Sequence, residues 1–170
     1  RGAERLSFDT VLASGPRSAL PHGRATDRVM AAGELVTIDF GAVYHGYCSD
    51  CTRTVVLGGP DERQRRVYDV VLDAQRQALA TIRPGVACRD VDACARSVIA
   101  AAGFGEAFGH SLGHGVGLEL DEWPVLAEGW TEPLRPGHVF CVEPKIVFPG
   151  EGAVGIEDQF AVTPEGAERL

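Results

Sequence analysis

Two histidines lie four residues apart in a glycine-rich stretch, GHSLGHGVGLELDEWP, at residues 109–124. They are His110 and His114, and the stretch ends in the acids Asp121 and Glu122. A hydrophobic core has little use for imidazole or glycine, whereas imidazole is a common metal ligand and glycine lets the backbone approach other groups closely. The composition of this stretch therefore indicates a chemical role.

Four carboxylates interrupt segments that otherwise read as β-strands. They are Asp39 in TIDFG, Asp50 in YCSDCTRT, Glu143 in FCVEPKIVF and Glu157 in VGIEDQF. Any one of them could lie on a solvated sheet face, but a buried ionised carboxylate is costly unless it is paired or bound to a metal. Arg53 and Lys145, the basic residues close to them in sequence, are too few to pair all four.

Four carboxylates and the neutral imidazole of His114 carry four negative charges, which two divalent cations would cancel. Oxygen ligands with one nitrogen favour manganese, cobalt, iron(II) or zinc over a thiolate-type site. Two such ions about 3 to 4 Å apart can activate a bridging water and polarise a substrate carbonyl together. We therefore expect two divalent ions, Mn²⁺ first, with Co²⁺, Zn²⁺ or Fe²⁺ as alternatives.

The elements that must position these residues follow an α+β order. The pattern predicts strands at 7–13, 35–41, 47–57, 138–148 and 153–162, with a hairpin turn in AVYHG and a Pro-Gly turn at 149–150. Helical spacing of apolar residues runs from Asp61 to Pro84, and a second helix is expected to be capped by Asp90 and to end before Gly103. No linker or repeat divides the chain.

Length and charge narrow the class of protein. The chain has 170 residues, the size of one domain, and a net charge of −8, which disfavours binding to nucleic acid or to an anionic membrane surface. Its apolar runs are shorter than a membrane span requires. We expect a cytoplasmic protein, and because the chain begins at Arg1 and not at Met, a segment of a longer chain.

Five cysteines are present, of which Cys48 and Cys51 form a CxxC. A zinc site would need further ligands of this kind, and a redox pair would be expected at a helix N-terminus. We interpret the cysteines as free thiols in a reducing compartment, packed as small buried hydrophobic residues.

The charged motifs together carry a family resemblance. IDFG with Asp39, GYCSD with Asp50, GHGVGLE with His114, VEP with Glu143 and GIED with Glu157 follow one another in order. This set resembles the dinuclear-metal motif of the pita-bread metallopeptidases, which include prolidases, Xaa-Pro aminopeptidases, methionine aminopeptidases and creatinases. The resemblance runs from about residue 7 to the C-terminus.

The resemblance implies a fold and an assembly. The expected fold is a mostly antiparallel curved sheet with helices on its outer face, here lacking the family's first helices. Residues 1–170 would be the C-terminal catalytic domain, and a homodimer would be expected.

The resemblance also implies a role for each ligand. Asp39 would bind one metal, Asp50 and Glu157 would bridge, and His114 and Glu143 would hold the second ion. Glu143 would also manage the proton of the bridging hydroxide that attacks the substrate.

Two further histidines match family residues that line the substrate cleft. His110 and His22, the latter in ALPHG, would hydrogen-bond the scissile carbonyl or its developing oxyanion. A loop histidine that caps backbone is the alternative for His22, and a polar strand-end residue for His110. His45 and His138 are expected to be exposed and structural, respectively.

Three positions depart from the family pattern. Asp121 stands where hydrolytic members usually have histidine, Gly155 where arginine is common, and Lys145 where glycine is usual. An ionised Asp121 cannot donate the hydrogen bond that histidine would give to a carbonyl. The predicted metal ligands are therefore intact, whereas the substrate-facing residues, Asp121 among them, are altered.

These observations leave three functions open. The first is a metal-dependent hydrolase of the Xaa-Pro dipeptidase or aminopeptidase type, acting on a short peptide or other small C–N substrate. The second is a creatinase-like or lyase-like enzyme for a non-peptide substrate, and the third is a binding module that has lost catalysis.

Overall fold

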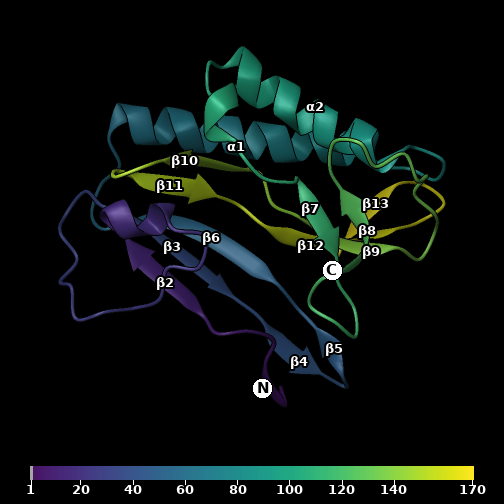
Figure 1. Cartoon of the computed structure of the whole chain (residues 1–170), viewed down its shortest axis with the longest axis horizontal. Helices are drawn as coiled ribbons and strands as arrows, with labels where there is room; N and C mark the ends of the chain where they lie inside the picture. Colours follow the sequence, from purple (N-terminus) through teal and green to yellow (C-terminus); the bar gives the residue numbers. More distant parts are fainter. Residues whose placement is uncertain (1) are drawn as a thin grey trace.

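The computed structural model describes residues 2–170, which form two long helices and a set of short strands (Figure 1). The elements are β1 (Arg5–Leu6), β2 (Val11–Ser14), η1 (Gly15–Ala19), β3 (Leu35–Phe40), β4 (Ala42–Tyr44), β5 (Tyr47–Cys48), β6 (Cys51–Val56), α1 (Glu62–Thr81), α2 (Cys88–Ala101), η2 (Gly105–Ala107), β7 (Gly113–Gly115), β8 (Glu122–Leu126), β9 (Val139–Val142), β10 (Lys145–Phe148), β11 (Gly152–Gly155), β12 (Asp158–Val162) and β13 (Ala167–Arg169).

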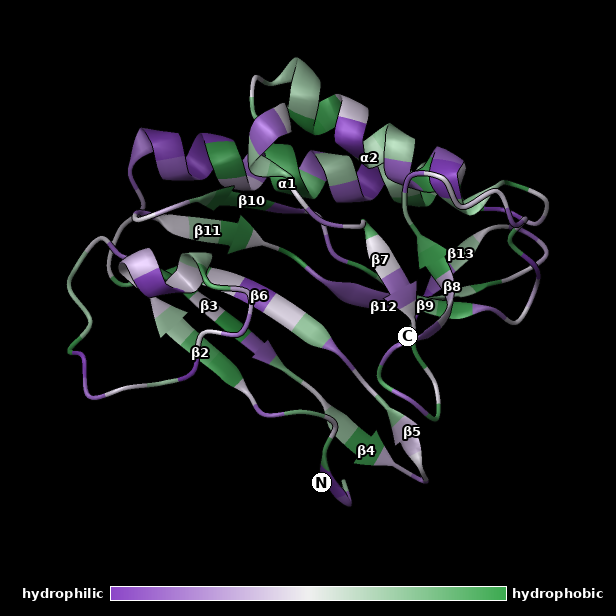
Figure 2. Cartoon of the chain, in the orientation of Figure 1, coloured by the Kyte–Doolittle hydropathy of each residue, from purple (hydrophilic) through white to green (hydrophobic). Residues whose placement is uncertain are grey.

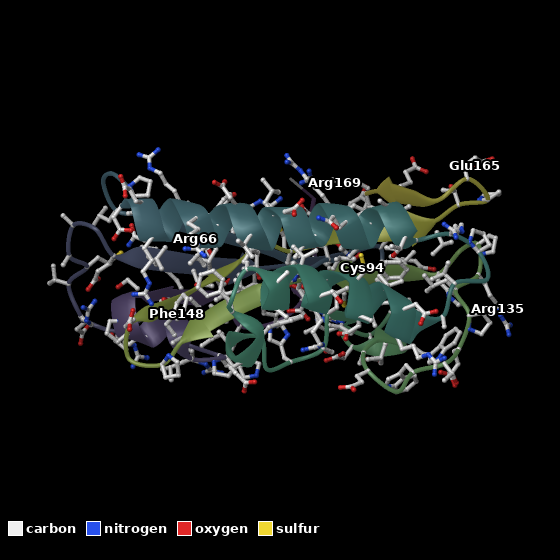
Figure 3. The ribbon with its side chains drawn as sticks, turned by 90° about the horizontal axis from the view of Figure 1, so that it is seen from above. Arg66, Cys94, Arg135, Phe148, Glu165 and Arg169 are labelled. Atoms are coloured by element: carbon white, nitrogen blue, oxygen red, sulfur yellow. The ribbon has the colours of Figure 1, made fainter. Side chains whose placement is uncertain are left out.

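The strands pair only in the antiparallel sense within the described part of the chain. They form a five-stranded sheet in the order β13-β12-β9-β7-β8, a three-stranded sheet β2-β3-β6, a second three-stranded sheet β1-β4-β5, and the pair β10-β11. Both helices lie on one side of these strands (Figure 1), and from above they run side by side (Figure 3). This arrangement confirms the expected α+β class, with helices on the outer face of antiparallel sheets.

The first helix forms where its sequence pattern predicts it. The Asp61 side chain accepts a hydrogen bond from the backbone of Gln64, and the Gln64 side chain accepts one from the backbone of Asp61, which closes a capping box. Polar and apolar residues alternate along both helices (Figure 2). The buried residues of the first helix, Val67, Val71, Ala74, Gln75 and Ala78, recur at helical spacing and face the sheets.

The second helix begins two residues before the expected cap. Ala87 precedes it, and Asp90 lies inside its first turn, so the prediction that Asp90 caps the helix is wrong. The reason is that Cys88 N–H donates to Glu132 O at 2.9 Å and Arg89 N–H to Trp130 O at 2.8 Å. A neighbouring loop thus satisfies amides that a capping side chain would otherwise satisfy.

The long predicted strands are shorter or divided. The segment 7–13 is a strand only from Val11, and 47–57, 138–148 and 153–162 are each interrupted by residues of non-strand conformation. The interruptions contain Asp50, Glu143 and Glu157, respectively. These carboxylates therefore lie where the chain passes from one sheet to another, and of the four only Asp39 lies within a strand.

A single core joins the helices to the sheets. Val91, Ala95 and Ile99 of α2 are fully buried in it, together with Phe140 of β9 and Ile146 of β10. Burying a valine, isoleucine or phenylalanine side chain stabilises a fold by about 1.5–3 kcal/mol. No helix in residues 2–170 is long and apolar enough to cross a membrane.

Candidate metal centre

The eight residues predicted to bind metal or substrate line one cavity of about 600 Å³. They are His22, Asp39, Asp50, His110, His114, Asp121, Glu143 and Glu157. Asp39 comes from β3 and His114 from β7, whereas the other three carboxylates expected to bind metal come from the strand interruptions. Residues more than a hundred positions apart in sequence are thus brought together by the meeting of the sheets.

The possible ligand atoms are close to one another. His114 Nε2 lies 3.9 Å from Asp50 Oδ2 and 3.7 Å from Glu143 Oε1. One such atom from each of Asp50, His114, Cys141 and Glu157 lies within 4.8 Å of the others. These separations are longer than hydrogen bonds, and they leave room for a cation among the atoms.

Burial raises the pKa of the clustered carboxyls. It is the largest cause for Asp39, Asp50, Glu143 and Glu157 alike. For Asp50 the negative charges of Glu157 and Asp39 add to it and raise the pKa to about 9. A carboxyl in such a place keeps its proton unless a positive charge compensates it.

The cluster has unsatisfied acceptors. Asp39 Oδ1 and Asp50 Oδ1 are buried with no hydrogen-bond partner within residues 2–170. Glu157 accepts one hydrogen bond, from Thr52 Oγ1 at 2.7 Å, and no arginine or lysine forms an ion pair with any of the four carboxylates in this part of the chain. Buried polar oxygens without partners are uncommon in proteins, so this donor set fits divalent cations.

The ring of His114 is oriented for a metal. Its Nδ1 lies 3.0 Å from the Gly115 carbonyl oxygen, which assigns the ring proton to Nδ1. The lone pair of Nε2 then faces Asp50 and Glu143. A metal-ligating histidine typically donates its other N–H in this way, which fixes its tautomer and its orientation.

Glycines next to His114 allow its strand to enter the sheet. A Cβ added to Gly113 would lie 1.9 Å from the Cys141 carbonyl oxygen, and one added to Gly115 would lie 2.5 Å from the Glu122 carbonyl oxygen. Side chains at these positions would push β7 away from β8 and β9. The glycine-rich composition thus reflects close packing of the backbone that carries His114.

The second helix fixes the loop that leads to this strand. Arg96 donates two hydrogen bonds of 2.9 Å to the buried Asp92, and two more of 2.9 Å to the Phe108 and His110 carbonyl oxygens. Asp92 in turn accepts from Leu112 N–H at 3.1 Å. The bidentate geometry of arginine and carboxylate gives this contact a defined direction.

The histidines outside the ligand set occupy different environments. His110 Nδ1 lies 2.7 Å from the Ser111 carbonyl oxygen, its buried Nε2 has no partner in residues 2–170, and burial lowers its pKa. A neutral ring that donates through Nδ1 presents an acceptor at Nε2, which differs from the donor role expected for His110. His22 is exposed at the cavity edge, and His45 is exposed in a turn as expected.

Asp121 lies beside the ligand histidine. Its side chain is 80% exposed, and Oδ1 is 3.4 Å from His114 Nδ1. It forms no ion pair with an arginine within residues 2–170. The neighbouring Glu122 has a structural role instead, since its carboxylate accepts from Glu119 N–H at 3.2 Å.

Cys141 was not recognised as a site residue from the sequence. It is fully buried, and its sulfur is among the four ligand atoms that lie within 4.8 Å of one another. The interpretation of the cysteines as simple buried hydrophobic residues is therefore incomplete. The available signal was the spacing of two between Cys141 and Glu143, which in the predicted strand 138–148 would place both side chains on one face. All five cysteines are free, as expected.

The model of metallopeptidase family M24 matches residues 1–164. The chain belongs to this family. The sequence motif, the antiparallel fold and the cluster of carboxylates agree with this assignment.

Individual proteins are similar to the chain over nearly its whole length. The Xaa-Pro dipeptidase of Pyrococcus horikoshii is 50% identical over 99% of the chain and 48% of its own length. The structure of the prolidase from Pyrococcus furiosus superposes with a TM-score of 0.96 and 49% identity, over 99% of the chain and 50% of its own. The X-Pro aminopeptidase from Thermotoga maritima superposes with a TM-score of 0.96 and 45% identity, over 99% of the chain and 48% of its own. The chain spans about half the length of the curated relatives it matches.

Proposed function

We propose that this M24 chain provides the catalytic domain of a dinuclear metal hydrolase of the Xaa-Pro dipeptidase type. The observation that carries the proposal is the group of four carboxylates around His114, which form no ion pair with an arginine or lysine within residues 2–170. Similarity to proteins named Xaa-Pro dipeptidase supports the choice of a peptide substrate. Residues 1–170 would be this domain, acting on a short peptide in the cytoplasm as part of a homodimer.

Each ligand residue would have a defined place in the centre. Asp50 and Glu157 would each hold both ions, Asp39 would hold one, and His114 and Glu143 would hold the other. Mn²⁺ is the proposed metal, because the set is rich in oxygen and contains one imidazole. The bound ions would supply an activated water and polarise the scissile carbonyl.

The residues of the chain would handle the proton and the substrate. Glu143, whose Oε1 lies 3.7 Å from His114 Nε2 in the cavity, would take a proton from the attacking water and return it to the leaving amine. His110 would accept a hydrogen bond from a substrate N–H through Nε2. His22, exposed at the cavity edge, would contact the substrate carbonyl.

The direct test is turnover with a panel of dipeptides. After loading with Mn²⁺, the protein should cleave Xaa-Pro dipeptides and show much less activity on Xaa-Ala dipeptides of the same first residue. Activity should disappear on chelation and return when Mn²⁺ is added back. A metal-loaded protein that cleaves neither class would contradict the proposal.

A second candidate function rests on Asp121. A carboxylate that is exposed in the cavity and has no arginine partner within residues 2–170 favours a cationic substrate group, as in a creatinase-like or lyase-like enzyme. Cyclic amidines and N-acyl diamines belong in the same panel. Turnover of one of these, with none of the dipeptides, would favour this second function.

A further inference from the structure

Lys145 stands in the cavity opposite a glycine. It is the first residue of β10, and in the antiparallel register it pairs with Gly155 of β11. A Cβ added to Gly155 would lie 3.2 Å from Lys145 Cγ and 3.4 Å from Lys145 Cδ. The stem of the lysine therefore lies across the bare backbone of Gly155, and both residues line the cavity with the carboxylates.

The ammonium group of Lys145 has no partner. No hydrogen bond or ion pair within 4.0 Å involves it in the described chain, although its side chain is half-buried. A lysine can pack its stem against the protein and keep its ammonium available, so Lys145 can bind a ligand group in the cavity.

The charge balance changes when metal is present. Two divalent cations would neutralise the four carboxylates, and the positive charge of Lys145 would then have no counterpart in the centre. The other cation at the cavity, Arg24, is paired with Asp9 at 2.5 Å. The loaded cavity would therefore present one available ammonium group and, apart from it, the exposed carboxylate of Asp121. The ammonium favours an anionic group on the substrate.

We propose that Lys145 is a specificity-determining residue that binds a carboxylate of the substrate, with Gly155 leaving the space for its stem. The inference rests on the proposed function, because a dipeptide carries its terminal carboxylate one residue from the scissile bond. An ammonium beside the centre would select the free acid over the neutral amide. The competing role is that Lys145 only screens the ligand carboxylates, in which case its loss would change metal binding and not substrate choice.

The test compares Xaa-Pro dipeptides with the corresponding Xaa-Pro amides on the Mn²⁺-loaded protein. The wild-type protein should prefer the acid in kcat/KM by about tenfold or more, as a charge-assisted hydrogen bond implies. Lys145→Met, which keeps the length of the stem and removes the charge, should reduce this preference at least about fivefold by raising KM for the acid. Its metal content should equal that of the wild-type protein.

Two controls separate charge from shape. Lys145→Arg should keep most of the preference for the acid, and Arg76→Met, which removes an exposed charge on the first helix, should leave the preference unchanged. Gly155→Ala should weaken the preference without loss of metal, because the added Cβ would displace the lysine stem. An unchanged preference in Lys145→Met with full metal content would overturn the proposal, and so would a loss of metal in place of a change in preference.

A binding measurement keeps the inference testable if no dipeptide is cleaved. Calorimetry with L-proline and L-prolinamide on the metal-loaded protein reports recognition of the carboxylate without turnover. Proline should bind the wild-type protein more tightly than prolinamide does, and Lys145→Met should remove the difference. Absence of turnover with this difference intact would contradict the proposed function and support the role of Lys145, whereas equal binding of the two probes to the wild-type protein would contradict the role of Lys145.

Discussion

Glu157 and Asp158 are consecutive residues, both almost fully buried, with opposite surroundings. Asp158 accepts hydrogen bonds from Arg53 at 2.5 Å and Arg169 at 2.6 Å. Glu157 faces the cavity with three other carboxylates and accepts one hydrogen bond, from Thr52. Two arginines compensate the charge of Asp158, whereas no arginine or lysine within residues 2–170 pairs with Glu157.

This difference shows how a buried acid can be structural or functional. Asp158 begins β12, where its paired carboxylate joins the chain end to β6, whereas Glu157 lies in the break before that strand. Burial is similar, with 2% of Glu157 and 8% of Asp158 exposed, so burial alone does not separate the two roles. The compensating cation does: arginine stabilises the scaffold at Asp158, and metal is expected at Glu157.

The largest effect is expected from neutralising Glu157. Glu157→Gln keeps the shape and the contact with Thr52 but removes a charge that both ions would share. Metal binding should be lost, and activity should fall at least about 10²-fold, the scale for loss of one electrostatic catalytic group. Activity assays with elemental analysis check this. A Glu157→Gln variant that keeps both metal and activity would contradict the metal-binding role that distinguishes Glu157 from Asp158.

Removing the metal should produce the next largest effect, on stability. At about a hundredfold excess of metal over its dissociation constant, binding adds about 2.7 kcal/mol to the free energy of unfolding. Chelation should therefore lower the melting temperature. A melt that does not move after verified removal of metal would contradict a shared site.

The metal-free protein should also lose stability as pH rises. The folded pKa of Asp50 is about 9, above the ordinary value of about 4, so between these values the folded state holds a proton that the unfolded state has released. The free energy of unfolding then falls with rising pH, by at most about 1.4 kcal/mol per pH unit for this proton. Melting curves from pH 5 to 8.5 should show this decline after chelation and a weaker one with Mn²⁺. The same pH dependence of the melting temperature with and without Mn²⁺ would contradict this prediction.

Asp158→Asn should have a moderate effect of a different kind. It removes the charge that Arg53 and Arg169 share, and because both arginines are partly exposed, we expect a loss of about 1–2 kcal/mol of stability. Metal content should stay the same. Chemical denaturation measures the loss of stability, and elemental analysis measures the metal content. Loss of metal without loss of stability would reverse the roles assigned to these neighbours.

Asp121→His should have the smallest effect. The change removes a negative charge 3.4 Å from His114, so cleavage of neutral Xaa-Pro peptides should rise and amine-bearing ligands should bind more weakly, each by less than about tenfold. Steady-state kinetics and ligand titrations measure both, with Asp27→His as an exposed control. If neither quantity moves while metal content is unchanged, Asp121 does not contact the substrate.

Sequence patterns predicted the elements well where interactions between residues close in sequence determine them. The helix that begins after Asp61 followed from its apolar spacing. The hairpin turn at His45 followed from its position between two β-type runs. The helix start at Cys88 did not follow, because its first amides donate to residues 130 and 132, contacts that no local pattern encodes.

The site could be predicted as a set but not in its details. Four acids in apolar runs indicated a shared cation, although it took the fold to show that three of them stand at strand interruptions. Asp158, and not Glu157, meets arginine because Arg53 and Arg169, a residue near the chain end, both reach it in the folded chain. The proton position on His110 likewise depends on a 2.7 Å contact with Ser111.

The most direct test of the account is the number of metal ions bound by the wild-type protein and by Asp50→Ala. If Asp50 bridges two ions, the wild-type protein should hold two equivalents of Mn²⁺ after loading and dialysis, and the variant should lose both together. Circular dichroism should show that the variant is folded. A folded Asp50→Ala protein that keeps two equivalents of metal by elemental analysis would contradict the shared, carboxylate-bridged centre.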